Sequence, residues 1–150
     1  MEAERIIKPS FAVIGLEGST RDGRDIVKQL WENANARFAE IEALALRGAD
    51  GGLMGIWGAM SDFSRSYKPW DNGFSEGLYL AGIEADADAE PPEGFTKWIL
   101  PGFEYVRADG SFSDGLEYLD SRGLHMIAAA QDFTDPKTGK NYILFPIRRL

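Results

Sequence analysis

Few residues in this chain could carry out nucleophilic or acid–base chemistry. His125 is the only histidine and cysteine is absent, so a serine–histidine–aspartate triad must use His125 or not exist. The chain also has no Gly-x-Ser-x-Gly segment, which often holds a nucleophilic serine. We therefore expect His125 to be a structural or surface residue.

Two short segments resemble metal or phosphate motifs only superficially. The run Asp86-x-Asp88-x-Glu90 lacks the glycine and the distal glutamate of a calcium loop. Gly139-Lys140 lacks the upstream glycine and the following serine or threonine of a phosphate-binding loop. We expect a solvated linker at the first segment, a hairpin turn at the second, and neither a metal site nor a cofactor.

Aromatic residues make up 12% of the chain and include Trp31, Trp57, Trp70 and Trp98. Their rings offer apolar faces that also attract cations, at about 0.5 to 2 kcal/mol each, which suits a ligand cavity. They also suit an ordinary core, so for any one ring both interpretations stay open. Trp31, for example, could equally pack a helix against a sheet.

Composition narrows the function classes. A length of 150 residues fits one domain with a real core. The net charge of −8 disfavours phosphate backbones and anionic lipid, so we expect no direct nucleic-acid partner and no membrane association. The absence of cysteine favours the cytoplasm. The N-terminus lacks a signal-peptide pattern, and no apolar run approaches the ~20 residues of a membrane span.

Hydrophobic periodicity predicts the elements of a first half. A strand is expected over residues 6–17, with a break at Pro9-Ser10, and a helix over residues 24–47, capped by Asp22 and ended by Gly48. Strands are expected over residues 52–59 and 77–84. The long loop between these two strands carries aromatic residues that could form a lid.

After an acidic, proline-bearing linker over residues 85–94, the same order recurs. A strand is predicted over residues 95–107, a helix over 113–121, and strands over 124–133 and 141–148. The fold class is therefore α+β: two strand–helix–strand–strand repeats, about 1–86 and 94–150, with pseudo-two-fold symmetry. Neither half could close a stable core alone, so we predict one domain in which antiparallel sheet surrounds a central ligand cleft.

Several segments, in this order, resemble the GyrI-like (gyrase-inhibitor-like) small-molecule-binding domain, which is also the effector-binding half of multidrug-responsive bacterial transcription activators. They are Leu30-Trp31, residues 78–84 (LYLAGIE), Pro92-Glu93-Gly94-Phe95, residues 100–105 (LPGFEY) and Phe145-Pro146-Ile147. The resemblance spans nearly the whole chain. It implies a central pocket for drug-like molecules, often hydrophobic cations.

The resemblance also implies a set of ligand-binding residues and one departure. The family commonly has a carboxylate in the fifth strand, two residues before an aromatic; aligned on Phe133, that position holds Gln131. A neutral amide cannot supply a charge-assisted contact, typically ~1.5 to 3 kcal/mol. Glu104 could replace the charge, but it neighbours Tyr105, so the two should face opposite sides. The expected lining residues are Trp57, Tyr79, Glu104, Tyr105, Gln131, Phe133 and Tyr142.

Three functions follow as expectations. The first is stand-alone binding of a small hydrophobic, neutral or cationic molecule, for sensing or sequestration, with no chemistry performed on it. The second is hydrolysis of strained, cyclopropane-bearing alkylating compounds, with Glu104 as general base assisted by Tyr105 and Trp57. The third is a regulatory or inhibitory role through a protein partner or a homodimer, to which the acidic linker would contribute charge.

Overall fold

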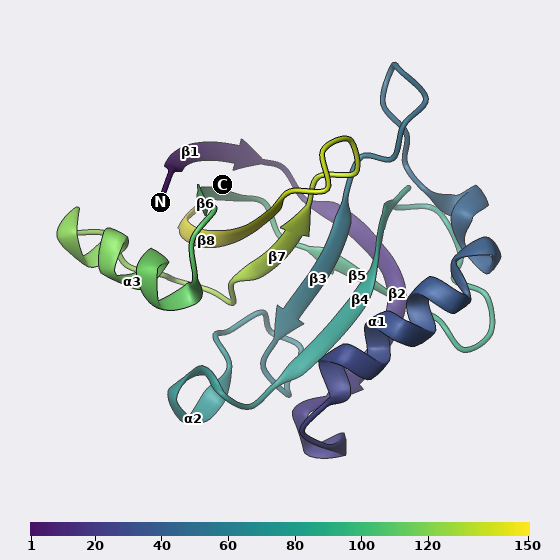
Figure 1. The fold of residues 1–150 in the computed structure, drawn as a ribbon, viewed down its shortest axis with the longest axis horizontal. Coiled ribbons are helices and arrows are strands. Elements are labelled where there is room, and N and C mark those ends of the chain that lie inside the picture. The colour runs from purple at the N-terminus through teal and green to yellow at the C-terminus, as the bar shows by residue number, and fades with distance from the viewer.

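The computed structural model describes residues 1–150 as an open eight-stranded antiparallel sheet with helices packed on its outer face (Figure 1). The strands are β1 (Ala3–Lys8), β2 (Phe11–Ser19), β3 (Ile56–Ser61), β4 (Leu78–Ala85), β5 (Thr96–Leu100), β6 (Phe103–Ala108), β7 (Gln131–Thr134) and β8 (Asn141–Arg149). The helices are α1 (Ile26–Ala36), the short α2 (Asp71–Phe74) and α3 (Phe112–Ser121). The predicted α+β class is confirmed.

The strand order is β1-β6-β8-β7-β3-β4-β2-β5. This order is symmetric about its centre. If each strand of the first half is exchanged with its counterpart in the second (β1 with β5, β2 with β6, β3 with β7, β4 with β8), the same order is obtained read backwards. The first strand of each half therefore pairs with the other half: β1 lies on β6, and β5 lies on β2. Strand exchange is the basis of the pseudo-two-fold arrangement.

The two halves meet at a narrow seam between β3 and β7. Only three residue pairs span it, Ile56 with Thr134, Trp57 with Phe133 and Gly58 with Asp132. The side chain of Gln131 extends the pairing: its Oε1 accepts from the Met60 amide at 2.7 Å, and its Nε2 donates to the Met60 carbonyl at 3.2 Å. A primary amide can do this because it carries both a donor and an acceptor, as a peptide group does.

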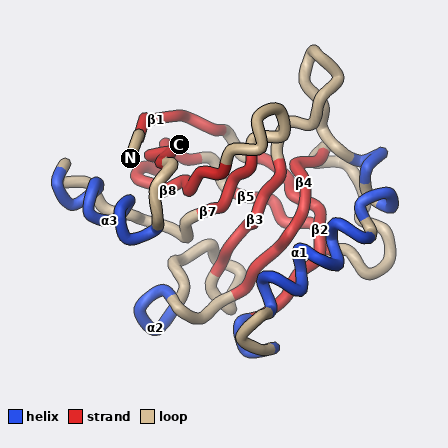
Figure 2. The backbone as a smooth tube through the Cα atoms, in the orientation of Figure 1, coloured by secondary structure: helices blue, strands red, loops and turns tan.

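Helix α1 packs on β2 and β4, and α3 packs on β8 (Figure 2). Strand alternation explains the contacts, since Tyr79, Ala81 and Ile83 of β4 share one face and meet Leu30 and Ala34 of α1. Helix α3 begins with a capping box, in which the Ser111 hydroxyl accepts from the Asp114 amide. None of the helices is long and apolar enough to cross a bilayer.

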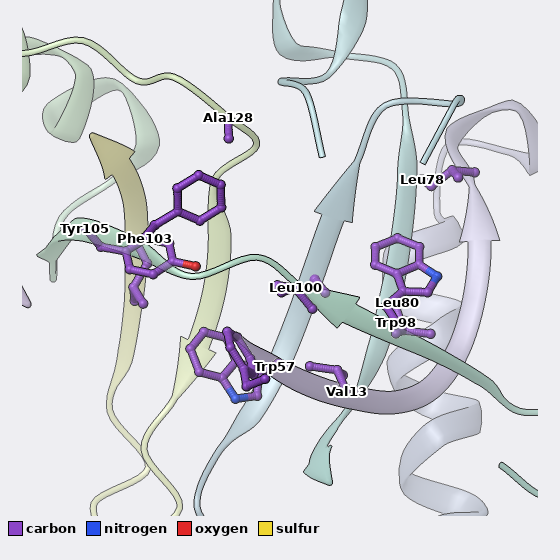
Figure 3. Packing of buried hydrophobic residues seen from close by; sticks show 12 residues of the cluster. Val13, Trp57, Leu78, Leu80, Trp98, Leu100, Phe103, Tyr105 and Ala128 are labelled. Carbon is purple, nitrogen blue, oxygen red and sulfur yellow. The ribbon is translucent and has the colours of Figure 1, made fainter. Parts of the chain in front are cut away.

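The inner face of the curved sheet holds the largest core cluster (Figure 3). It joins both halves, because Trp57 and Leu80 of the first share it with Tyr105 and Leu144 of the second. The exchanged β5 contributes Trp98 and Leu100 to the same cluster, and all of these side chains are at most 4% exposed. A core shared in this way means that each half buries its inner apolar face only against the other.

Several predicted boundaries were wrong. The strands expected over residues 6–17 and 95–107 each divide in two, at Pro9-Ser10 and Pro101-Gly102, and the pieces lie in opposite halves of the sheet. The helix expected over residues 24–47 ends at Ala36 and continues as two 3₁₀ turns, Phe38–Glu40 and Glu42–Leu44. Most of the strand expected over residues 124–133 is irregular, and only β7 pairs.

Candidate functional site

A cleft crosses the outer face of the sheet above the seam, between α1 and α3. Its first compartment is apolar and has a volume of about 250 Å³. Rings from the β3–β4 connection and from α3 form its walls, and the sheet forms its floor. The lining residues are Met60, Pro69, Trp70, Phe74, Phe112, Met126, Ala129, Ala130, Asp132 and Ile143.

The second compartment is polar and has a volume of about 440 Å³. It lies between α1 and the end of the β7–β8 hairpin, and it shares Asp132 and Ile143 with the first, so the two form one continuous cleft. Its lining residues are Trp31, Gly58, Tyr79, Asp109, Gly110, Asp132, Phe133, Thr134, Asn141, Tyr142 and Ile143. The polar compartment lies within the range of about 300 to 1,000 Å³ that is typical of small-molecule sites, and the apolar one lies just below it.

Asp132 stands where the two compartments meet. Its Oδ2 accepts a hydrogen bond of 3.0 Å from the Tyr79 hydroxyl, which in turn accepts one of 3.0 Å from Trp31 Nε1. Oδ1 has no hydrogen-bond partner in the protein and is not enclosed by it. Gly58 makes this arrangement possible, because a Cβ there would lie 1.8 Å from the Tyr79 hydroxyl oxygen. One carboxylate oxygen is thus fixed while the other faces the cleft.

The electrostatics of this group follow from its surroundings. Desolvation raises the pKa of Asp132 above its usual value, and the hydrogen bond from Tyr79 acts in the opposite direction. Burial, together with the neighbouring Asp132 charge, also raises the pKa of Tyr79, so its hydroxyl stays protonated and donates. An ionised Asp132 therefore lacks a compensating positive charge, and a cation in the cleft would supply one.

The β3–β4 connection covers one end of the apolar compartment. Trp70 Nε1 donates to the Leu78 carbonyl at 3.0 Å, which holds the indole against the sheet. Phe74 is 43% exposed, has a φ of 65°, and meets Phe112 of α3 edge to face at 5.3 Å between ring centroids. The segment predicted as a lid therefore bridges α2 and α3 above the cavity.

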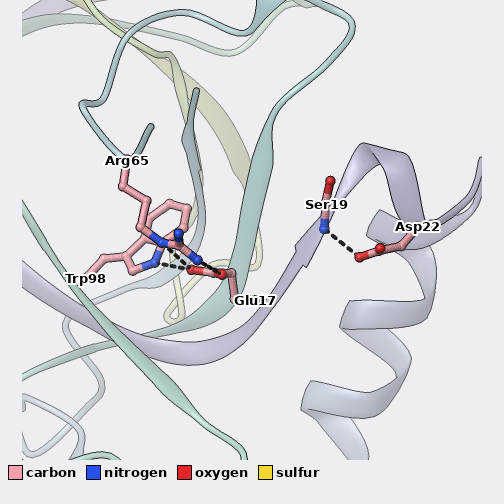
Figure 4. Close-up of polar contacts among 5 residues, drawn as sticks. All are labelled: Glu17, Ser19, Asp22, Arg65 and Trp98. Atoms are coloured by element: carbon pink, nitrogen blue, oxygen red, sulfur yellow. Dashed lines mark hydrogen bonds and ion pairs between the residues drawn. The ribbon is translucent and has the colours of Figure 1, made fainter. Parts of the chain in front are cut away.

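The same connection is tied down on the inner side of the sheet. Glu17 of β2 accepts from Trp98 Nε1 at 2.7 Å and pairs with Arg65 in the loop, while Asp22 closes a nearby capping box on Ser19 (Figure 4). The Ala129 amide also donates to the Tyr67 carbonyl at 2.8 Å. These contacts fix the part of the loop that follows β3 and leave α2 as its exposed part.

Three of the predicted lining residues lie in the cleft. Tyr79, Phe133 and Tyr142 all border the polar compartment. Tyr79 holds Asp132 there, whereas the rings of Phe133 and Tyr142 pack against the inner core. Phe133 stacks on Tyr142 and, on its other side, lies 4.7 Å from Trp57 between ring centroids. These two rings therefore border the cleft along β7 and β8.

The other four predicted residues lie elsewhere. Trp57 is buried in the inner core and donates to Glu84 at 3.0 Å, and Tyr105 is fully buried there with an unpartnered hydroxyl. Glu104 pairs with Arg148 across the sheet at 3.2 Å. The side-chain amide of Gln131 forms its hydrogen bonds with backbone groups of the seam, and its Nε2 also donates to the Ala129 carbonyl at 3.2 Å. None of the four lines either compartment of the cleft.

Asp132 is the residue that sequence reasoning missed. Alignment on Phe133 directed attention to Gln131, but in a strand these two residues share a face and Asp132 points to the other. The signal was present in the sequence, since Ala130, Asp132 and Thr134 alternate with the residues that join the seam and the inner side. The sequence pattern alone does not indicate which face of β7 lines the cleft.

Comparison with known proteins identifies the fold. No protein-family model and no curated protein matches the chain. Among solved structures, SAV2435 bound to tetraphenylphosphonium superposes with a TM-score of 0.64 at 15% identity, over 99% of this chain and 94% of that one. EcmrR in a complex with DNA superposes with a TM-score of 0.62 at 9% sequence identity, over 99% of this chain and 58% of the EcmrR chain. The C-terminal domain of EcmrR superposes with a TM-score of 0.58 at 11% sequence identity, over 99% of this chain and 98% of that domain. The chain thus has the fold that the GyrI-like resemblance predicted.

Proposed function

We propose that this chain binds a small lipophilic cation in the cleft, with its apolar part in the first compartment and its charge beside Asp132. The observation that carries the proposal is the half-buried carboxylate of Asp132, which has one oxygen held by Tyr79 and the other open at the edge of an aromatic cavity. Neutral apolar molecules of similar shape bind more weakly, because they leave this charge uncompensated.

The chemistry of the cleft favours a cation in two ways. A carboxylate in surroundings of low polarity attracts an opposite charge more strongly than one in bulk water. The rings of Trp70, Phe74 and Phe112 add apolar contact and negative ring faces, worth about 0.5 to 2 kcal/mol for each well-placed ring. A quaternary or fully arylated cation also sheds its weakly held water at little cost, so the apolar walls do not oppose its entry.

The solved structures support a ligand of this kind. SAV2435 shares the fold and was solved with tetraphenylphosphonium, a lipophilic cation, and the C-terminal domain of EcmrR shares it too. We propose that the domain senses or sequesters its ligand. Coupling of this chain to transcription would require a DNA-binding unit associated with it.

The geometry gives less support to the other two functions. A hydrolase that uses Glu104 as base would need it beside Tyr105 and Trp57 in a space that admits substrate. Instead, Glu104 is paired with Arg148, and both rings are enclosed in the inner core. In the acidic linker, which would carry a protein-interaction role, Asp86, Asp88 and Glu90 are exposed, as in a solvated connector. We therefore retain binding as the proposed function.

Calorimetric titration with tetraphenylphosphonium tests the proposal, with Met60→Trp as the blocking variant. Met60 lines the apolar compartment, so a larger ring there fills the space that the ligand needs. Met54→Trp is the matched control, because Met54 is exposed and lies outside the cleft. We expect micromolar binding, weakened at least tenfold by Met60→Trp and unchanged by Met54→Trp. If no lipophilic cation in a panel binds tighter than about millimolar, ~4 kcal/mol, the proposal fails.

A further inference from the structure

We infer that the ligand for which this cleft is built is an elongated amphipathic diamine: a ring system in the apolar compartment, one protonated amine at Asp132, and a second in the polar compartment. This inference rests on the proposed function and specifies the chemical class of its ligand. A compact cation uses the first compartment and Asp132 and leaves the larger polar compartment to water.

The arrangement of the cleft carries the first step. The two compartments are continuous through Asp132, yet one is lined by rings and the other by polar groups, including Thr134, Asn141 and Asp109. Thr134 follows Asp132 by two residues on the same strand face, so it lies about 7 Å further along the cleft. The ligand that fits both compartments is therefore long, with an apolar end and a polar end on either side of one charge.

The second step is that an ammonium group already pairs with Asp109, a residue that lines the polar compartment. Lys140 Nζ is 3.4 Å from Asp109 Oδ2 and 5.4 Å from the centre of the Tyr142 ring. Both Asp109 and Tyr142 line the compartment. Lys140 lies at the end of the β7–β8 hairpin loop and is about half exposed, so its ion pair is weak. A ligand amine in the compartment can replace it at Asp109.

The charges around the compartment favour a second amine over a neutral tail. Hydrogen bonding from the Glu2 amide lowers the pKa of Asp109, which keeps this carboxylate ionised. Arg107, which stacks over Tyr142, is neutralised by an ion pair with Glu4. The net charge of −8 further attracts a dication over a monocation.

Two matched ligands test the inference by calorimetry: N-(1-naphthylmethyl)butane-1,4-diamine and N-(1-naphthylmethyl)butylamine, which differ only in the second amine. We expect the diamine to bind at least tenfold more tightly. Asp109→Asn keeps the acceptor for the Glu2 amide but removes the charge, so it should abolish the difference while leaving the monoamine unaffected. Lys140→Gln removes the competing ammonium and should widen the difference. Asp120→Asn, an exposed substitution on α3, should change neither affinity.

The outcomes separate this inference from the proposed function. Equal affinity of the two ligands for the unmodified chain would overturn the diamine assignment and leave cation binding intact. A diamine advantage that survives Asp109→Asn would also overturn it, since the second amine would then lie elsewhere. Failure of both amines and of tetraphenylphosphonium to bind would refute the proposed function itself.

Discussion

Replacing Asp132 with asparagine should separate the affinity of the cleft for cations from the stability of the fold. The amide keeps an acceptor for the Tyr79 hydroxyl and nearly the same volume, so the change removes little except the charge. Tetraphenylphosphonium has no hydrogen-bond donor, so the variant loses only Coulomb attraction, which is about 3 kcal/mol for unit charges ~5.5 Å apart at an effective dielectric constant of about 20 and less where water screens it. Because about 1.4 kcal/mol corresponds to a factor of ten, affinity for tetraphenylphosphonium should fall by about 10- to 150-fold.

The pH dependence of the same variant gives an independent check. Tetraphenylphosphonium does not titrate, and desolvation raises the pKa of Asp132. Binding to the unmodified chain should therefore weaken as the pH falls through this raised pKa, at a higher pH than the ordinary aspartate value of about 3.9. Binding to Asp132→Asn should not change with pH over the same range. Equal affinities and identical pH profiles for the two proteins would refute the role given to Asp132.

The stability of the variant should move in the opposite direction. A carboxyl group with a raised folded-state pKa costs stability once the pH exceeds that pKa, and this cost is absent below the unfolded-state pKa. Asp132→Asn should therefore raise the free energy of unfolding at neutral pH and give no gain near pH 3. Urea unfolding at the two pH values measures the difference.

Three further substitutions probe the surroundings of the cleft. Gln131→Glu should destabilise the fold by about 1 to 3 kcal/mol in urea unfolding at neutral pH, less in acid, because an ionised carboxylate cannot donate to the carbonyls of the seam, and it should not strengthen cation binding. Gly58→Ala should displace the Tyr79 hydroxyl and weaken ligand binding in titrations, whereas unchanged affinity would show that this hydroxyl does not position the site. Trp57→Phe should cost about 1 to 3 kcal/mol by leaving Glu84 without its buried donor, yet leave ligand affinity unchanged.

Much of the fold could be predicted from the sequence, because each half repeats the same order of apolar periodicities. The exchange of first strands could not be predicted in this way. Pro9-Ser10 and Pro101-Gly102 both read as irregularities within one strand, whereas the chain uses each break to cross to the other half of the sheet. A local pattern shows that pairing is interrupted, but the partner of each piece is decided by the long-range register.

The candidate site was predicted in part for a related reason. The family resemblance, rather than residue type alone, directed attention to Phe133 and Tyr142, and both residues border the cleft. The family's carboxylate position fell on Gln131, whereas the carboxylate at the cleft belongs to Asp132, because a shift of one residue along a strand reverses the face to which a side chain points. Glu104 drew attention as an acidic residue, but its pairing with Arg148 depends on the β6–β8 register, which includes a bulge beside it.

The exchanged strands have a consequence for how this chain could be divided. A cut in the acidic linker between β4 and β5 would produce two fragments, each of which carries an edge strand that completes the other's sheet. Neither fragment could satisfy its β2 or β6 backbone alone, so the two should assemble only as an interlocked pair. The split chain could therefore report on ligand binding, because a ligand that contacts both fragments at the seam between β3 and β7 would promote their assembly.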